Sequence, residues 1–242
     1  MRVSARVFFS MPSRTQNKRK GTLRFHLVTL FREACEPYLT TSILGRAQRE
    51  KKIKITYHSP RDFVDNRWGK VDERPYGGGP GMVMMALPVV KAARKALARR
   101  LSSRAKPRIA IIWFTPEGKL FTNKEADALA TYDDLVLVAG RYEGIDERAA
   151  SLLRTLAPVK KYSLGPYTLT GGELPALVLV DAVTRRLPGV LGKDASVEER
   201  RISSHKVYTR PEVIVWEGKK YRVPKVLTTG NHARIDAWRT SR

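Results

Sequence analysis

Glycine loops are the feature of this chain most able to form a site for a small molecule. They occur at residues 77–81, at Gly140 and Gly144, at Gly165, and at residues 171–172. Glycine lets the backbone approach a ligand closely or adopt a positive φ. None of these loops has the phosphate-binding G-x-x-x-x-G-K-[S/T] spacing or the dinucleotide-binding G-x-G-x-x-G spacing after a strand. One such loop is more often a tight turn, but together they predict a pocket built mainly from backbone.

Metal and thiol chemistry have little support in the sequence. Cys35 is the single cysteine, so no internal disulfide can form and a cytoplasmic location is favoured. The four histidines are scattered and have no cysteine partners at metal-ligand spacing, which argues against a zinc site. The longest apolar runs have the length of a strand and are too short for a membrane span.

The charge of the chain points to a polyanionic partner. There are 46 Lys and Arg against 23 Asp and Glu, a net charge of +23, and a balance of this size favours nucleic acid. Residues 1–21 carry six basic groups and no acid and are interpreted as a flexible basic tail. Residues 91–108 carry eight basic groups and no acid, with apolar residues at helical spacing. Their basic face is therefore either simply solvated or in contact with phosphates.

Alternating strands and helices must position the glycine loops. The strand-like segments are 23–30, 53–58, 109–114 and 135–139. The helical segments are 31–48 with a gap near Pro37, 86–103, a helix opened by a capping box at 122–125, and 173–187. The continuous apolar strands are typical of burial on both faces. The alternation predicts a largely parallel sheet covered by helices, followed by a linker at 193–204 and a small basic module at 205–242.

Several long segments of this chain resemble one known family. The similarity to the bacterial tRNA (guanine-37 N1)-methyltransferases covers nearly the whole chain, from about Leu23 to Arg239, and the segments keep the family's order and spacing. They are SILGRA at 42–47, SPRDF at 59–63, RPYGGGPGM at 74–82, GRYEGIDER at 140–148, LTGGEL at 169–174, PGVLG at 188–192, YTRP at 208–211 and GNH at 230–232.

The resemblance implies a fold and a set of partners. The fold is the α/β parallel sheet of the SPOUT superfamily with a deep trefoil knot over residues 22–192, followed by a shortened C-terminal tRNA-binding module. The protein would be a cytoplasmic homodimer with tRNA as its partner and no membrane contact, and each active site would use two subunits. The cofactor would be S-adenosylmethionine, in a pocket lined by Thr115, Pro116, Gly140, Arg141, Tyr142, Glu143, Gly144, Leu164, Gly165, Pro166, Tyr167, Thr168, Leu169, Gly171 and Gly172.

Methyl transfer to guanine N1 needs a base for the N1 proton and a positive group near O6. Arg185 stands where similar enzymes have an arginine, although an exposed arginine at a helix end is the other interpretation. Arg200 stands where they have an aspartate, and an arginine cannot act as a base. We therefore expect Glu199, or its neighbour Glu198, to take the proton. A solvated linker charge is the alternative for Glu199.

Two other functions fit the same sequence. One is a basic RNA-binding relic on the same fold that no longer transfers methyl groups. The other is a methyltransferase that acts on a different RNA. The two intact glycine segments at 140–144 and 169–172 favour an enzyme, because an RNA-binding protein needs no such pocket. The sequence leaves open whether a divalent ion such as magnesium assists.

Overall fold

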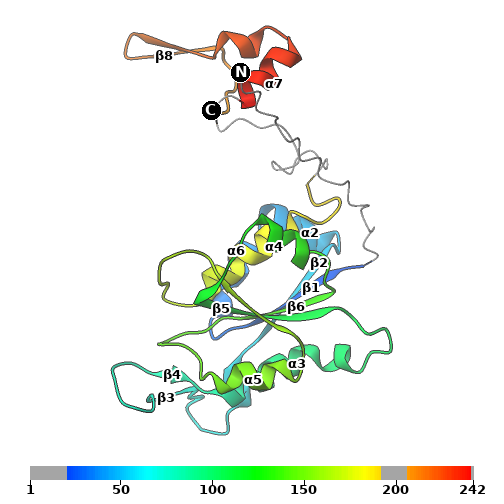
Figure 1. The fold of residues 1–242 in the computed structure, drawn as a ribbon, viewed down its shortest axis with the longest axis vertical. Coiled ribbons are helices and arrows are strands. Elements are labelled where there is room, and N and C mark those ends of the chain that lie inside the picture. The colour runs from blue at the N-terminus through cyan, green and yellow to red at the C-terminus, as the bar shows by residue number, and fades with distance from the viewer. Residues whose placement is uncertain (1–20, 192–205, 241–242) are drawn as a thin grey trace, which may run out of the picture.

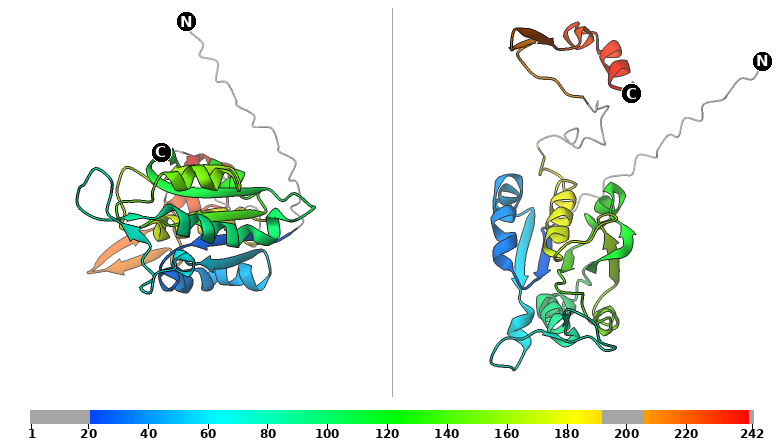
Figure 2. Two further views of the ribbon diagram at one scale, coloured as in Figure 1. Left: turned by 90° about the horizontal axis from the view of Figure 1, so that it is seen from below. Right: turned by 90° about the vertical axis from the view of Figure 1, so that its left-hand side faces the viewer.

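The computed structural model describes residues 21–191 and 206–240. Residues 21–191 form three layers, in which one parallel sheet lies between two groups of helices (Figures 1 and 2). The predicted α/β class with a parallel sheet is thereby confirmed. Over these two ranges, no helix is both long and apolar enough to cross a bilayer.

Five strands form the central sheet, each parallel to its neighbours. In chain order they are β1 (Leu23–Val28), β2 (Ile53–His58), β5 (Ile109–Leu120), β6 (Asp134–Val138) and β7 (Val159–Ser163). Across the sheet the order is β2-β1-β6-β5-β7, which places β6 at the centre. The four predicted strands are therefore present, and β5 continues beyond its expected end at residue 114.

The central strand shows why the sheet is buried on both faces. Successive side chains of a strand point to opposite faces. In β6, Leu135 and Leu137 belong to one hydrophobic cluster, and Val136 and Val138 belong to the other. Because both faces pack against helices, the strand is a continuous apolar run and does not alternate with polar residues.

The helices divide between the two faces. One layer contains α1 (Arg32–Thr40), α2 (Ser42–Arg49), α4 (Asn123–Leu129) and α6 (Glu173–Thr184), and the other contains α3 (Ala86–Leu101) and α5 (Arg148–Arg154). The 3-10 helix η1 (Pro60–Phe63) packs against α3. A short antiparallel pair, β3 (Asp72–Glu73) with β4 (Val83–Met84), encloses the glycine loop at residues 77–81.

The predicted helical gap near Pro37 is wrong in its position. Pro37 lies inside α1, and the chain breaks at Thr41, whose backbone is extended. Proline removes one backbone donor, which costs α1 one hydrogen bond without ending it. Gly45 explains the tight corner between α1 and α2. A Cβ at Gly45 would lie 2.0 Å from the carbonyl oxygen of Thr40, so only glycine allows this approach.

The helix α4 begins where the capping box predicts, with Thr122 as its N-cap. The hydrogen bonding differs from the expected pattern, because the Thr122 hydroxyl donates to the Glu125 carboxylate and does not accept from a backbone N–H. Glu125 also pairs with Lys119 at 2.6 Å. Hydrogen bonds from Lys119 and Thr122 lower the pKa of Glu125 to about 2, so this carboxylate is charged and joins β5 to α4.

Residues 206–240 contain a hairpin followed by helices. Their elements are β8 (Val213–Trp216), β9 (Lys219–Arg222), the 3-10 helix η4 (Lys225–Thr228) and α7 (His232–Thr240). The hairpin turns through Glu217 and Gly218, both at positive φ (51° and 74°). A two-residue turn with two positive φ angles matches the twist of an antiparallel pair.

Candidate functional site

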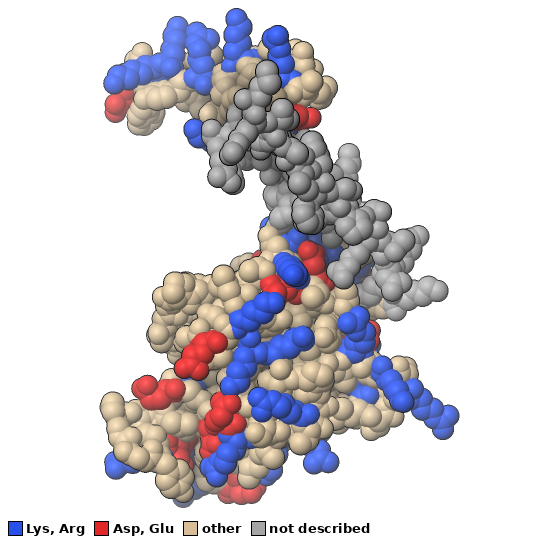
Figure 3. Space-filling view, viewed as in Figure 1, with Lys and Arg blue, Asp and Glu red and all other residues tan. Residues whose placement is uncertain are grey.

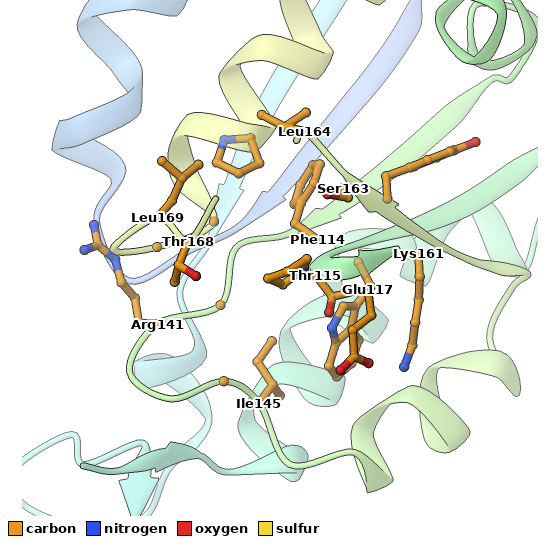
Figure 4. Close-up of a pocket in the computed structure, with 18 of the residues that line it drawn as sticks. Phe114, Thr115, Glu117, Arg141, Ile145, Lys161, Ser163, Leu164, Thr168 and Leu169 are labelled. Carbon is orange, nitrogen blue, oxygen red and sulfur yellow. The ribbon is translucent and has the colours of Figure 1, made fainter. Parts of the chain in front are cut away.

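A pocket of about 380 Å³ lies at the carboxyl ends of β5, β6 and β7 (Figure 4). The chain leaves these strands in three loops, and each loop contributes to the wall. Parallel α/β sheets place their ligands at this edge, because the strand ends leave a crevice there. Among the residues predicted to bind the cofactor, all except Pro166 line this pocket.

The first loop is an irregularity in β5. The pairing of β5 with β7 shifts between Phe114 and Lys119, so Thr115 and Pro116 leave the sheet and face the pocket. Gly118 brings the chain back against β7. A Cβ at this position would lie 2.5 Å from the carbonyl carbon of Tyr162, so a side chain here would separate the two strands.

The second loop follows β6 and is held by backbone hydrogen bonds. Met84 donates its N–H to the carbonyl of Gly144 at 2.9 Å, and Glu143 donates to the carbonyl of Met82 at 3.0 Å. Tyr142 adopts a positive φ of 60°, which turns the loop sharply between these contacts. The β3–β4 pair therefore supports the loop from outside the pocket, which gives the glycine segment at 77–81 a structural neighbour in the segment at 140–144.

The third loop meets the second at Gly172. Its N–H donates to the carbonyl of Gly140 at 2.8 Å, directly before α6 begins. A Cβ at Gly172 would lie 2.6 Å from Cα of Ala139 and 2.8 Å from the backbone nitrogen of Gly140. Backbone atoms cannot move aside as a side chain can. The close approach that builds the pocket floor therefore requires glycine at residue 172.

Arg141 has a role in holding the loops together. Its Nε lies 2.9 Å from Oε2 of the buried Glu173, as an ion pair whose angle does not suit a hydrogen bond. Its guanidinium carbon lies 4.5 Å from the ring centroid of Phe31, and Thr29 donates to the other oxygen of Glu173 at 2.8 Å. The guanidinium points away from Thr115 (Figure 4), so Arg141 joins the second loop to the start of α6 and to the segment that follows β1.

Sequence reasoning missed several lining residues. They are Trp113, Phe114, Glu117, Ile145, Glu147, Lys161, Tyr162, Ser163 and Pro175. Ile145 and Glu147 belong to the segment at 140–148, and Pro175 directly follows the segment at 169–174. The other six lie in β5 or β7 where these strands meet the loops, so the position of the strands was their signal. Burial raises the pKa of Tyr162, which keeps its hydroxyl neutral. Lys161 pairs with Glu147 at 2.7 Å, so the wall of the pocket carries both signs of charge.

Of the two predicted catalytic residues, only Arg185 belongs to the described part of the chain, and it does not line this pocket. Arg185 is the C-cap of α6, at the opposite end of that helix from Gly172. The 12 residues of α6 span about 18 Å at the usual rise per residue. Glu198 and Glu199 lie outside the described residues, as does Arg200. In the part of the chain that is described, no three His, Cys, Asp or Glu side chains are grouped so that they could hold a metal ion.

Comparison with known proteins gives one consistent family. The sequence profile of the family described as "tRNA (Guanine-1)-methyltransferase TrmD" matches residues 23–242. Three relatives carry the name tRNA (guanine-N(1)-)-methyltransferase. The one from Thermomicrobium roseum is 42% identical over 90% of this chain and 77% of its own length. The one from Clostridioides difficile is 39% identical over 90% of both chains. The one from Pseudomonas entomophila is 44% identical over 90% of this chain and 84% of its own length. A match over this length places the chain in the tRNA (guanine-1)-methyltransferase family.

Proposed function

We propose that this protein transfers a methyl group from S-adenosylmethionine to N1 of guanine-37 in tRNA. The observation that carries the proposal is the convergence of three loops on one pocket at the carboxyl edge of the sheet; two of these loops contain the family segments 140–148 and 169–174. Membership of the family supports the proposal that the chain forms the deep trefoil knot of the SPOUT superfamily. Activity on tRNA also supports a cytoplasmic location.

The pocket suits this cofactor in size and chemistry. Its volume of about 380 Å³ lies within the range of roughly 300–1,000 Å³ that is usual for small-molecule sites. Glycines at 140, 165 and 171 line the cavity, so the backbone can approach a ligand closely and would read the edge of an adenine through main-chain groups. Glu117 and Glu143 line the same pocket and would attract a cationic ligand. When bound, S-adenosylmethionine supplies a methyl group on a positively charged sulfur.

The chain itself must supply the chemistry on guanine. We assign charge stabilisation at O6 to Arg185 and removal of the N1 proton to Glu199. A positioned cation lowers the energy of the charge that develops on O6 as N1 loses its proton. Glu199 is the carboxylate next to Arg200, which occupies the place of the aspartate in similar enzymes.

A homodimer would bring Arg185 of one subunit to the pocket of the other. One helix length lies between them in a single chain, so Arg185 of a second subunit would complete the site. The outer face of α6 supports this arrangement. Leu174 and Val178, one turn apart, are 57% and 47% exposed, and Tyr38, which donates its hydroxyl to Asp181 of the same helix, is 49% exposed. An apolar face of this kind beside a ligand pocket is typical of a protein interface.

Transfer from labelled S-adenosylmethionine to tRNA transcripts tests the proposal. Transcripts with guanine at position 37 should gain the label, and digestion should release it as 1-methylguanosine. Transcripts with adenine at position 37 should gain none. Binding of both ligands without transfer would instead identify an RNA-binding relic. Equal labelling of both transcripts, or of an unrelated RNA, would identify a different target.

A further inference from the structure

The hairpin formed by β8, the turn at Glu217-Gly218 and β9, here called the ribbon, contributes no residue to the lining of the described pocket. Its strands pair Ile214 with Tyr221 and Trp216 with Lys219. Because side chains alternate along a strand, these four residues share one face of the ribbon. Tyr221 and Trp216 lie diagonally across the two strands, at a separation that aromatic side chains can span.

The ribbon exposes its large side chains to an unusual degree. Trp216 is 66% exposed, Tyr221 is 55% exposed and Ile214 is 55% exposed. The aromatic residues elsewhere in the same module behave differently, because Tyr208 and Trp238 contact each other with ring centroids 6.1 Å apart. Burial of an aromatic ring is strongly favourable in water, and an isolated two-stranded hairpin is at best marginally stable. The exposed face therefore indicates a partner.

The charge of the ribbon selects the kind of partner. Its two strands carry Lys219, Lys220 and Arg222 and no acidic residue, and Glu217 in the turn is the one acid between them. Residues 206–240 as a whole carry eight Lys and Arg against three Asp and Glu. Figure 3 shows Lys and Arg side chains gathered along one face of this module. Exposed aromatic rings next to cations are the combination that stacks on bases while binding phosphates.

We propose that the ribbon is an RNA-binding surface that stacks unpaired tRNA bases on Trp216 and Tyr221. Lys219 lies on the aromatic face, where it would contact the backbone of the stacked nucleotides. Lys220 and Arg222 lie on the opposite face and would contact phosphates of an adjacent segment. The proposal rests on tRNA being the substrate, and it adds the residues that hold the RNA.

The double variant Trp216→Ala/Tyr221→Ala tests the stacking part. Loss of one stacked base corresponds to about 5- to 150-fold weaker tRNA binding. The double variant Trp216→Phe/Tyr221→Phe should retain much of the affinity, because phenylalanine also stacks. Val207→Ala is the matched control, since Val207 is an 86% exposed apolar residue of the same module outside the ribbon. Calorimetric titration with S-adenosylmethionine should give the same affinity for every variant.

Salt dependence tests the charged part. The triple variant Lys219→Ala/Lys220→Ala/Arg222→Ala should flatten the dependence of tRNA affinity on salt by up to about 0.7–0.9 log unit per lost phosphate contact. The aromatic variant removes no charge, so its salt slope should equal that of the unmodified protein. This difference separates stacking from a general loss of folding in the module.

Kinetics distinguish this proposal from the proposed function. With the ribbon variants, KM for tRNA should rise while kcat at saturating tRNA stays unchanged. If the unmodified protein methylates tRNA and the aromatic variant binds tRNA with unchanged affinity, the ribbon proposal is wrong and the proposed function stands. A change of mass in light scattering without a change in tRNA affinity would assign the ribbon to contact with a second copy of the chain and would overturn the proposal. No methyl transfer by the unmodified protein would overturn the proposed function itself.

Discussion

The pocket at the carboxyl edge of the sheet is shaped by closely packed backbone, whereas the ribbon of residues 213–222 presents large side chains to the solvent. At Gly172 the pocket is formed by backbone that lies against other backbone, with no space for a single added carbon. In the ribbon, Trp216 and Tyr221 point outward and more than half of each side chain is exposed. Changes in the pocket should therefore abolish binding of S-adenosylmethionine. Changes in the ribbon should weaken binding of tRNA by degrees, and loss of its Lys and Arg side chains should also reduce the salt dependence of that binding.

The largest effect is expected at Gly172, where the comparison is easiest to break. Gly172→Ala places a Cβ 2.6 Å from Cα of Ala139, so the start of α6 must move away from the end of β6. The neighbouring atoms belong to the backbone and cannot move aside as a side chain can, so the pocket itself must change shape. Calorimetry should show no measurable S-adenosylmethionine binding.

The control is Gly140→Ala, whose added carbon would meet the flexible end of Ile145 at 3.2 Å. Because that side chain can shift by a few tenths of an ångström, the loss of affinity should be much smaller. Equal losses in the two variants would show that backbone contact is not what makes the pocket sensitive.

The second largest effect concerns Glu199, which lies in the predicted linker between the two regions and outside the described residues. A general base contributes about 10²–10⁴-fold to a rate, so Glu199→Gln should slow turnover by that order and leave both ligands bound. The rate should recover as pH rises, because guanine N1 then loses its proton unaided. Glu198→Gln is the control and should retain its rate. Full activity of Glu199→Gln at neutral pH would refute the assignment of the base.

Two ion pairs of the same chemistry, one in the central sheet and one in the module of residues 206–240, extend the comparison to stability. Asp134 is fully buried, with Arg100 at 2.7 Å and His26 at 3.1 Å. Burial alone would raise the pKa of Asp134, but hydrogen bonds from His26 and Arg100 outweigh it and hold the pKa below its ordinary value. Asp236 pairs with Arg239 at 3.2 Å, where both side chains are 43% exposed.

Asp134→Asn should lower the free energy of unfolding by about 1–3 kcal/mol, because it leaves buried partners without a charge to pair with. Asp236→Asn should change it by no more than about 0.5 kcal/mol, since exposed pairs contribute little. Urea unfolding at neutral pH measures both. Similar losses would mean that the module is packed as tightly as the sheet.

The smallest effect is a pH dependence of stability that arises from His58, the last residue of β2. Burial, and then the neighbouring His26, lowers the pKa of His58, which faces Asp62 and Lys95 as well. The unfolded chain therefore binds the proton more readily, so the stability from neutral His58 is present above about pH 6.5 and declines below it. His58→Gln should make this decline shallower in thermal melts between pH 5 and 8. His232→Gln, in the exposed start of α7, should leave the decline as it is; a matching change there would place the pH dependence outside the sheet.

The sequence predicted the sheet well where burial leaves a plain signal. The apolar run at 135–139 became the central strand β6. Strand β7 (Val159–Ser163) was missed, because it lies at the edge of the sheet and two of its five residues are the partly exposed Lys160 and Lys161. The break between α1 and α2 was misplaced to Pro37, because the close contact at Gly45 that fixes the corner depends on three-dimensional packing.

The candidate site was predicted from motifs more completely than from residue types. The glycine segments located the pocket, yet Pro166 in the third loop does not line it, and Trp113 and Ile145 do. The ribbon has a local signal in Glu217-Gly218, a two-residue turn between β-forming residues. The prediction of a small basic module did not include this hairpin. Which side chains stay exposed on it depends on packing, which no local pattern contains.

The most direct test of the division between pocket and ribbon is a pair of affinities measured on the same two variants. For Gly172→Ala, S-adenosylmethionine binding should be lost while tRNA affinity stays within about twofold of the unmodified protein, a difference of under roughly 0.5 kcal/mol. For Trp216→Ala/Tyr221→Ala, tRNA affinity should fall while S-adenosylmethionine affinity is unchanged. If either variant loses affinity for both S-adenosylmethionine and tRNA, the cofactor pocket and the RNA-binding surface are not separate, and the account is contradicted.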